Sequence, residues 1–167
     1  MARFAGIVLL ALAAIGAAAG QTKLAIINSQ KAVLDTAEIK KAQAELEAKY
    51  KPRQDQLVKL QKDLQDIQAQ LQGGKLNQSA EQDLTAQGQR KQRELQRIQE
   101  DLQADVDRER QDILQRTGQR MQDVVKKLAD EKGLDVVIDS SNTVFFKTAL
   151  ELTTEATAAY DKAYPVK

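Results

Sequence analysis

The chain has 167 residues, with 25 Lys and Arg against 24 Asp and Glu, and it contains no His, no Cys and no Trp. Without His or Cys it lacks the commonest general base, the commonest metal ligands and every thiol nucleophile. A net charge of +1 and only 3 Phe and 3 Tyr offer little to attract a nucleic acid or to stack on its bases. The composition therefore argues against a metalloenzyme, a thiol enzyme and a nucleic-acid-binding protein.

Residues 1–20 have the pattern of a secretory signal peptide. Arg3 gives the start a positive charge, residues 4–15 form an apolar run, and small residues follow up to Gly20. This order predicts export, with cleavage after Ala19 or Gly20, and the mature chain is expected in a bacterial periplasm. The alternative is a retained membrane anchor, which the Ala and Gly content of the run disfavours.

Three short strands are predicted near the ends of the mature chain. Residues 23–28 (Lys-Leu-Ala-Ile-Ile-Asn) and 134–139 (Leu-Asp-Val-Val-Ile-Asp) are rich in β-branched residues and end in turn-forming residues. Residues 143–146 (Thr-Val-Phe-Phe) predict a third strand. A short helix is expected over residues 153–164, where Pro165 ends it.

The middle of the chain, residues 36–132, predicts a long helical hairpin. Helical sequence is expected from around residues 30–36 up to residue 72 and again over residues 79–132, with a Gly-Gly turn placing the tip near residues 73–78. The remaining positions are crowded with Gln, so this segment cannot bury a globular core. Apolar residues recur in the first helix at spacings of 3 and 4, the period of a coiled-coil seam, at Leu57, Leu60, Leu64, Ile67 and Leu71.

Pro52 lies inside the first predicted helix, where it removes a backbone hydrogen bond. Two interpretations stay open. Pro52 is either a hinge within one helix or a first-turn residue of a new helix that starts after a break at Tyr50 and Lys51.

Residues 21–35 and 133–167 are expected to form a small β/α body from which the hairpin projects. Three short strands make a sheet that is marginal on its own, so a closed homo-oligomer that pools the strands of its subunits is expected. The fold class is thus mainly α, with an antiparallel coiled-coil hairpin on an oligomeric β body. The strand residues expected to mediate assembly are Leu24, Ile26, Val136 and Ile138.

The order of these segments resembles the Skp/OmpH family of periplasmic chaperones. The resemblance runs from Gln21 to Lys167, and its specific part is the two ends: the strands at residues 23–28 and 134–139, then Asn-Thr-Val at 142–144 and Glu-Leu-Thr at 151–153. It implies a homotrimer whose pooled strands form a β body and whose helical arms enclose unfolded outer-membrane proteins. Well-known members are markedly basic, whereas this mature chain is neutral.

A basic stripe is the first candidate contact surface. Arg90, Arg93 and Arg97 recur at helical spacing near the tip residue Lys75, where they would meet lipopolysaccharide, another anionic lipid surface or acidic client segments. The alternative is an ordinary solvated face, in which Arg90 and Arg97 pair with the acids four residues later.

Two further clusters of side chains are candidates for a metal site and a catalytic site. The acidic row of Asp105, Glu109 and Asp112 lies on a straight helix, which makes a poor calcium cage. Ser140 and Ser141 follow a strand and are explained by a turn, since Lys is the only base available to activate them. No catalytic site, metal site or cofactor is therefore expected.

The leading functional hypothesis is an ATP-independent periplasmic holdase chaperone that binds unfolded outer-membrane β-barrel proteins. No Gly-rich phosphate-binding loop followed by Lys and Ser or Thr occurs in the sequence. The alternative is a structural or adaptor coiled-coil protein of the cell envelope. An enzyme that uses Lys, Asp or Glu is the least favoured of the three.

Overall fold

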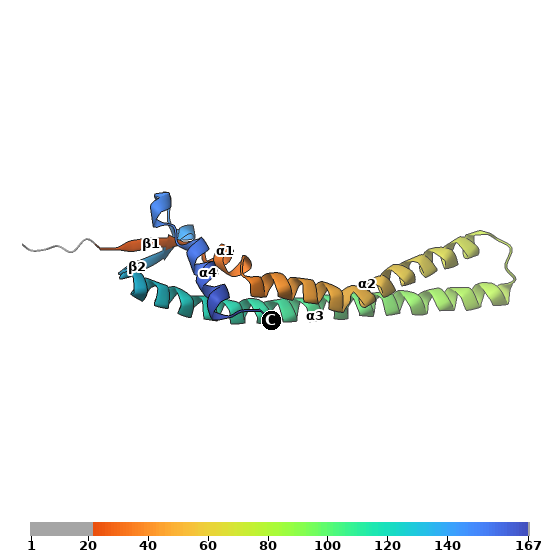
Figure 1. Cartoon of the computed structure of the whole chain (residues 1–167). Coiled ribbons are helices and arrows are strands. Elements are labelled where there is room, and N and C mark those ends of the chain that lie inside the picture. The colour runs from red at the N-terminus through yellow and green to blue at the C-terminus, as the bar shows by residue number, and fades with distance from the viewer. Residues whose placement is uncertain (1–21, 167) are drawn as a thin grey trace, which may run out of the picture.

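The computed structural model describes residues 22–166, and the predicted signal peptide lies outside the described residues. Two long helices lie side by side and project from a small body that holds both ends of the described chain (Figure 1). The predicted fold class, a mainly helical chain with a hairpin and a small β part, is confirmed. The element order is β1 (Leu24–Ile27), α1 (Ser29–Leu34), α2 (Ala37–Gln72), α3 (Gln78–Lys132), β2 (Val136–Asp139), η1 (Ser140–Asn142), η2 (Thr148–Leu150) and α4 (Thr153–Ala163).

Helix α2 has 36 residues and α3 has 55, which correspond to lengths of about 54 and 82 Å. Side chains cap the start of both helices, since Thr36 accepts from the backbone of Ile39 and Asn77 accepts from that of Ala80. Gly133 ends α3 in a left-handed conformation with φ 61°. Because Thr36 caps a new helix, α1 and α2 are separate, and the long helix starts at the end of the predicted starting range of residues 30–36.

Helix α2 runs without interruption through Pro52, so the predicted break at Tyr50 and Lys51 is wrong. The two helices pack along the predicted seam, in which Leu60 and Ile67 are buried. A Cβ at Gly88 would lie 3.4 Å from Cγ2 of Ile67, so a glycine on α3 permits close approach of the helices. The other predicted seam residues of α2, which are Leu57, Leu64 and Leu71, are half-buried.

The body is built on a parallel pair of strands. β1 pairs with β2 in the register Leu24 to Val136 and Ile26 to Ile138, and a single parallel bridge joins Ile26 to Glu151 on its other side. Helix α4 and the base of α3 pack against this pair. The core they share consists of Ala25, Ile27, Ala32, Met121, Val124, Leu128, Leu152, Ala156 and Tyr160.

The predicted third strand is wrong for the single chain. Residues 143–146 connect η1 to η2 without forming a strand. A strand needs a neighbour that accepts and donates backbone hydrogen bonds, and β1 already has β2 on one side and the bridge to Glu151 on the other. Val144 and Phe145 are consequently exposed, with relative accessibilities of 107% and 82%.

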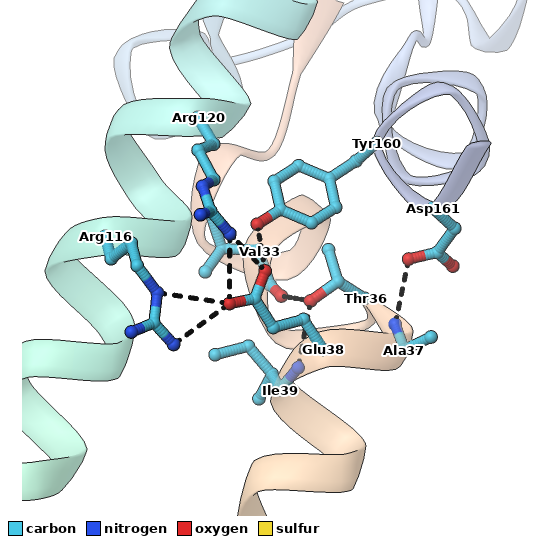
Figure 2. A network of polar contacts seen from close by, with 9 residues as sticks. All are labelled: Val33, Thr36, Ala37, Glu38, Ile39, Arg116, Arg120, Tyr160 and Asp161. Atoms are coloured by element: carbon cyan, nitrogen blue, oxygen red, sulfur yellow. Dashed lines mark hydrogen bonds and ion pairs between the residues drawn. The ribbon is translucent and has the colours of Figure 1, made fainter. Parts of the chain in front are cut away.

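A polar cluster joins the hairpin to the body (Figure 2). The carboxylate of Glu38, in the first turn of α2, accepts hydrogen bonds from Arg116 at 3.0 Å and Arg120 at 3.1 Å on α3. It also accepts from the hydroxyl of Tyr160 on α4 at 2.5 Å. We call Glu38, Arg116, Arg120 and Tyr160 the Glu38 cluster. It ties three helices together at the point where the hairpin leaves the body.

Burial alone would raise the pKa of Glu38, but the hydrogen bonds from Tyr160 and Arg116 and the charges of both arginines outweigh it and lower the pKa. Burial and the neighbouring carboxylate raise the pKa of Tyr160, which stays protonated as a donor. Because the folded-state pKa of Glu38 lies below its unfolded value, its contribution to stability is present above the unfolded pKa and is lost as the pH falls through the folded one.

We expect Glu38→Gln to lower the free energy of unfolding at neutral pH by about 1–2 kcal/mol, because it removes the charge that pairs both arginines. The difference from the parent protein should shrink as the pH falls through the lowered pKa of Glu38, because the carboxyl group then becomes protonated. Urea unfolding followed by circular dichroism at fixed protein concentration measures both values. Glu47→Gln, at an exposed position of the same helix, is the matched control, and an equal loss in the control would contradict the prediction.

Candidate functional site

Exposed apolar side chains gather at the body end of the molecule, opposite the hairpin tip. Leu24 and Val136, which are register partners in β1 and β2, have relative accessibilities of 37% and 43%. Val144 and Phe145 stand on the loop that follows β2. Apolar residues exposed together in this way mark a surface that is suited to a protein contact.

The four predicted assembly residues fall into two groups. Leu24 and Val136 are exposed on the sheet, whereas Ile26 is buried within its own chain and Ile138 is half-buried. Residues two apart in a strand share a face, so alternation does not separate the two groups. The exposed pair lies at the start of both strands, and Ile26 and Ile138 lie farther along them, where Ile26 also bridges to Glu151. The sequence prediction did not select Val144 and Phe145 as assembly residues. Both are more exposed than Leu24 and Val136, so they are better candidates for a subunit contact.

Ion pairs join α2 to α3 along the hairpin. Lys91 pairs with Asp63 at 2.7 Å and Arg53 pairs with Asp105 at 2.7 Å, and Glu109 pairs with Lys49. Hydrogen bonds from these cations lower the pKa of all three carboxyl groups. Asp105 and Glu109 belong to the acidic row that is a candidate metal site. Both form ion pairs with cations of the facing helix.

The predicted basic residues are exposed on α3 and in the tip turn. Arg90 lies 12 residues into α3, about 18 Å from the start of that helix, so the structure does not bring Lys75 together with the three arginines. Arg97 lines a shallow hollow with Arg53, whose guanidinium is paired with Asp105. Within residues 22–166, neither Arg90 nor Arg97 forms an ion pair with the acid four residues later, which is Glu94 for Arg90 and Asp101 for Arg97.

An apolar groove opens at the foot of the hairpin, between α2, α3 and the end of α1. Its volume is about 290 Å³. Ile39 forms its floor and is 3% exposed, while Leu34 at its rim is 37% exposed. Sequence reasoning missed this groove, for which the only local signals are the neighbouring pairs Val33-Leu34 and Ile113-Leu114. The groove is lined by Leu34, Ile39, Ala42, Gln43, Leu46, Val106, Arg110, Ile113 and Leu114.

The serines that follow β2 have a structural role. Ser140 and Ser141 form η1, and the carboxylate of Asp139 accepts hydrogen bonds from the backbone of Ser141 at 2.9 Å and of Ser29 at 3.1 Å. Hydrogen bonding by the side chains of Ser29 and Ser141, together with these backbone bonds, holds the pKa of Asp139 far below its usual range. Over residues 22–166 there is no group of three or more acidic side chains placed to hold a metal ion, and no helix there has both the length and the apolarity to cross a membrane.

Comparisons with known proteins cover most of the chain, including the body and the hairpin. The chain is similar to the crystal structure of a candidate outer membrane chaperone (OmpH-like) from Caulobacter crescentus CB15, with 20% sequence identity, a TM-score of 0.72 and coverage of 87% of each chain. At that identity the likeness establishes the fold. No curated protein matches the sequence. The model of the OmpH-like outer membrane protein family matches residues 23–160, and the chain therefore belongs to that family.

Proposed function

We propose that this protein is an ATP-independent holdase of the periplasm that binds unfolded outer-membrane β-barrel proteins and keeps them from aggregating on their way to the outer membrane. The observation that carries the proposal is the open apolar groove at the foot of an elongated, largely polar hairpin. Membership of the OmpH-like family, the likeness to a candidate outer membrane chaperone and the signal-like residues 1–20 support it.

The geometry suits a binder of unfolded chains better than a binder of one folded ligand. An unfolded barrel protein exposes strand edges and apolar side chains through which it aggregates. A carrier of varied clients needs weak and adaptable contacts rather than a closed pocket. The groove is open to solvent and the hairpin offers a long exposed surface beside it, so a client can be held loosely and released without nucleotide hydrolysis.

The working form that we propose is a homotrimer. β2 has a free edge, because β1 occupies only one of its sides, and the predicted strand at residues 143–146 has no pairing partner within the described chain. Pairing between these segments of neighbouring subunits would close the sheet and cover Val144 and Phe145. Three hairpins held by one closed body would surround a shared space, with their grooves at its base.

The exposed basic residues Lys75, Arg90, Arg93 and Arg97 are a proposed secondary contact for lipopolysaccharide, an anionic membrane surface or acidic client segments. The charge of these residues is offset over the chain as a whole, which carries a net charge of +1. We therefore assign the main part of client binding to uncharged surfaces.

The holdase proposal predicts that the mature chain keeps a urea-unfolded porin in solution after dilution, without nucleotide. Light scattering on a sizing column should show a complex with one porin and three copies of this chain. Precipitation of the porin beside an intact oligomer, at molar excess of that oligomer, would remove the holdase proposal and favour the envelope adaptor.

Replacing the groove leucines Leu34 and Leu114 with Gln should weaken porin binding about tenfold, because each change removes apolar area that a client side chain would cover. Both leucines lie at the groove and outside the predicted seam. The matched control is Val58→Gln, at an apolar position of α2 that is 65% exposed and distant from the groove. Equal binding by the groove variant and the control would show that the groove does not hold clients.

The assembly proposal predicts that Val144→Ser combined with Phe145→Ser yields a monomer in sedimentation equilibrium while the helix content in circular dichroism is kept. Both side chains are exposed in the single chain, so their loss costs the isolated fold little. Val58→Ser serves as the control for removing an exposed apolar residue elsewhere. A double variant that retains the mass of the parent assembly would contradict the prediction.

A further inference from the structure

The two sides of the hairpin differ in chemistry. From residue 60 to 71 of α2 and from residue 88 to 102 of α3, the buried or half-buried seam residues are Leu60, Leu64, Ile67 and Leu71 on α2 and Gly88, Lys91, Leu95, Ile98 and Leu102 on α3. The half-buried Leu57 and Leu84 lie outside these ranges and are followed by Val58 and Thr85. The residue that follows each of the nine seam residues within the ranges is a glutamine, although only 19 of the 69 residues from 54 to 122 are Gln. We call these nine exposed residues the amide face: Gln61, Gln65, Gln68, Gln72, Gln89, Gln92, Gln96, Gln99 and Gln103.

All nine glutamines lie on one side of the hairpin. A step of one residue turns any α-helix by about 100° in the same hand. Because α2 and α3 run in opposite directions, this turn carries the side chains of both helices from the seam toward the same side. The residues that precede the seam lie on the opposite side, and seven of those nine are charged: Lys59, Asp63, Asp66, Arg90, Glu94, Arg97 and Asp101.

The groove opens on the same side as the amide face. Two of its lining residues, Gln43 and Leu114, directly follow the inward-facing Ala42 and Ile113, so they stand in the same relation to the seam as the nine glutamines. On α3 the row continues from Gln103 through Asp107 and Arg110 to Leu114 at steps of four, three and four residues. The row of glutamines along the hairpin thus leads, past the charged Asp107 and Arg110, to an apolar groove at its foot.

The hydrogen bonds of the glutamines show what the amide face offers a ligand. Nε2 of Gln96 donates to Glu100 at 2.8 Å and Nε2 of Gln103 donates to Asp107 at 2.8 Å. These bonds occupy amide N–H groups and leave the carbonyl oxygens of both side chains able to accept. From Gln89 to Gln103 the row rises about 21 Å, the length of about six residues of extended chain.

We propose that the amide face binds the main chain of an extended, unfolded polypeptide, with glutamine carbonyl oxygens accepting its backbone N–H groups while the groove takes its apolar side chains. The inference rests on the proposed function and specifies how the client is recognised. Neutral amides match the unpaired amides that an unfolded strand carries in every sequence. Each such bond contributes little in net terms because water competes for it, so binding is independent of sequence and reversible.

The test compares two short peptides of alternating Thr and Tyr, one of which carries N-methyl groups at every second residue and so lacks those N–H donors. Binding is measured by fluorescence anisotropy to the parent protein and to two variants with five alanines each, which favour helix. The amide-face variant replaces Gln89, Gln92, Gln96, Gln99 and Gln103. The control variant replaces exposed glutamines outside that face: Gln56, Gln70, Gln87, Gln111 and Gln115.

The parent protein and the control variant should bind the unmethylated peptide about tenfold more tightly than the methylated one, as one or two net hydrogen bonds would give. The amide-face variant should bind both peptides equally. A parent protein that holds the unfolded porin but does not distinguish the peptides would overturn this inference and leave the proposed function standing. A smaller assembly mass for the amide-face variant would also overturn it, because the face would then belong to a second copy.

Discussion

A hairpin of two helices can bury only the single seam between them, and this geometric limit shapes the rest of the protein. Along the upper hairpin the seam is mostly half-buried, with Leu60 and Ile67 as its tightly buried members. The largest cluster of buried side chains forms where α3 packs against α4 and β1, around Met121, Ala156 and Tyr160. The body therefore supplies the stable end, and the hairpin depends on the body for its position.

The Glu38 cluster fixes the position of the hairpin relative to the body. Helix α2 is separated from α1 at residues 35–36, so the short connection alone does not fix its direction. The carboxylate of Glu38 does so by engaging α3 and α4 at once, and Arg120 also stacks on the ring of Tyr164 at 4.8 Å. A cluster that holds three helices with a single carboxylate is stable only if all its members stay paired, because any orphaned charge there would be costly.

The features that the sequence predicted correctly are those set by residues close together in the chain. The spacing of Leu57 to Leu71 predicted the hairpin, the Gly-Gly turn predicted a tip, and Gly133 predicted the end of α3, because periodicity and positive φ are read over a few residues. The Glu38 cluster had no such signal, since Tyr160 lies 122 residues from Glu38. The strand over residues 143–146 was predicted from its composition, but a strand also needs a pairing partner, and within the single chain this segment pairs with no strand.

The separation of charge from amide across the hairpin follows from the same narrow seam. Three ion pairs join α2 to α3 along the hairpin, between Lys91 and Asp63, between Arg53 and Asp105, and between Lys49 and Glu109. Charge used in this way stabilises the hairpin and is withdrawn from ligand binding. The opposite side is free to carry neutral glutamines, whose bonds to any one ligand are individually weak. A near-neutral chain with an uncharged amide face would bind unrelated polypeptides without selecting them by charge, as the proposed function requires.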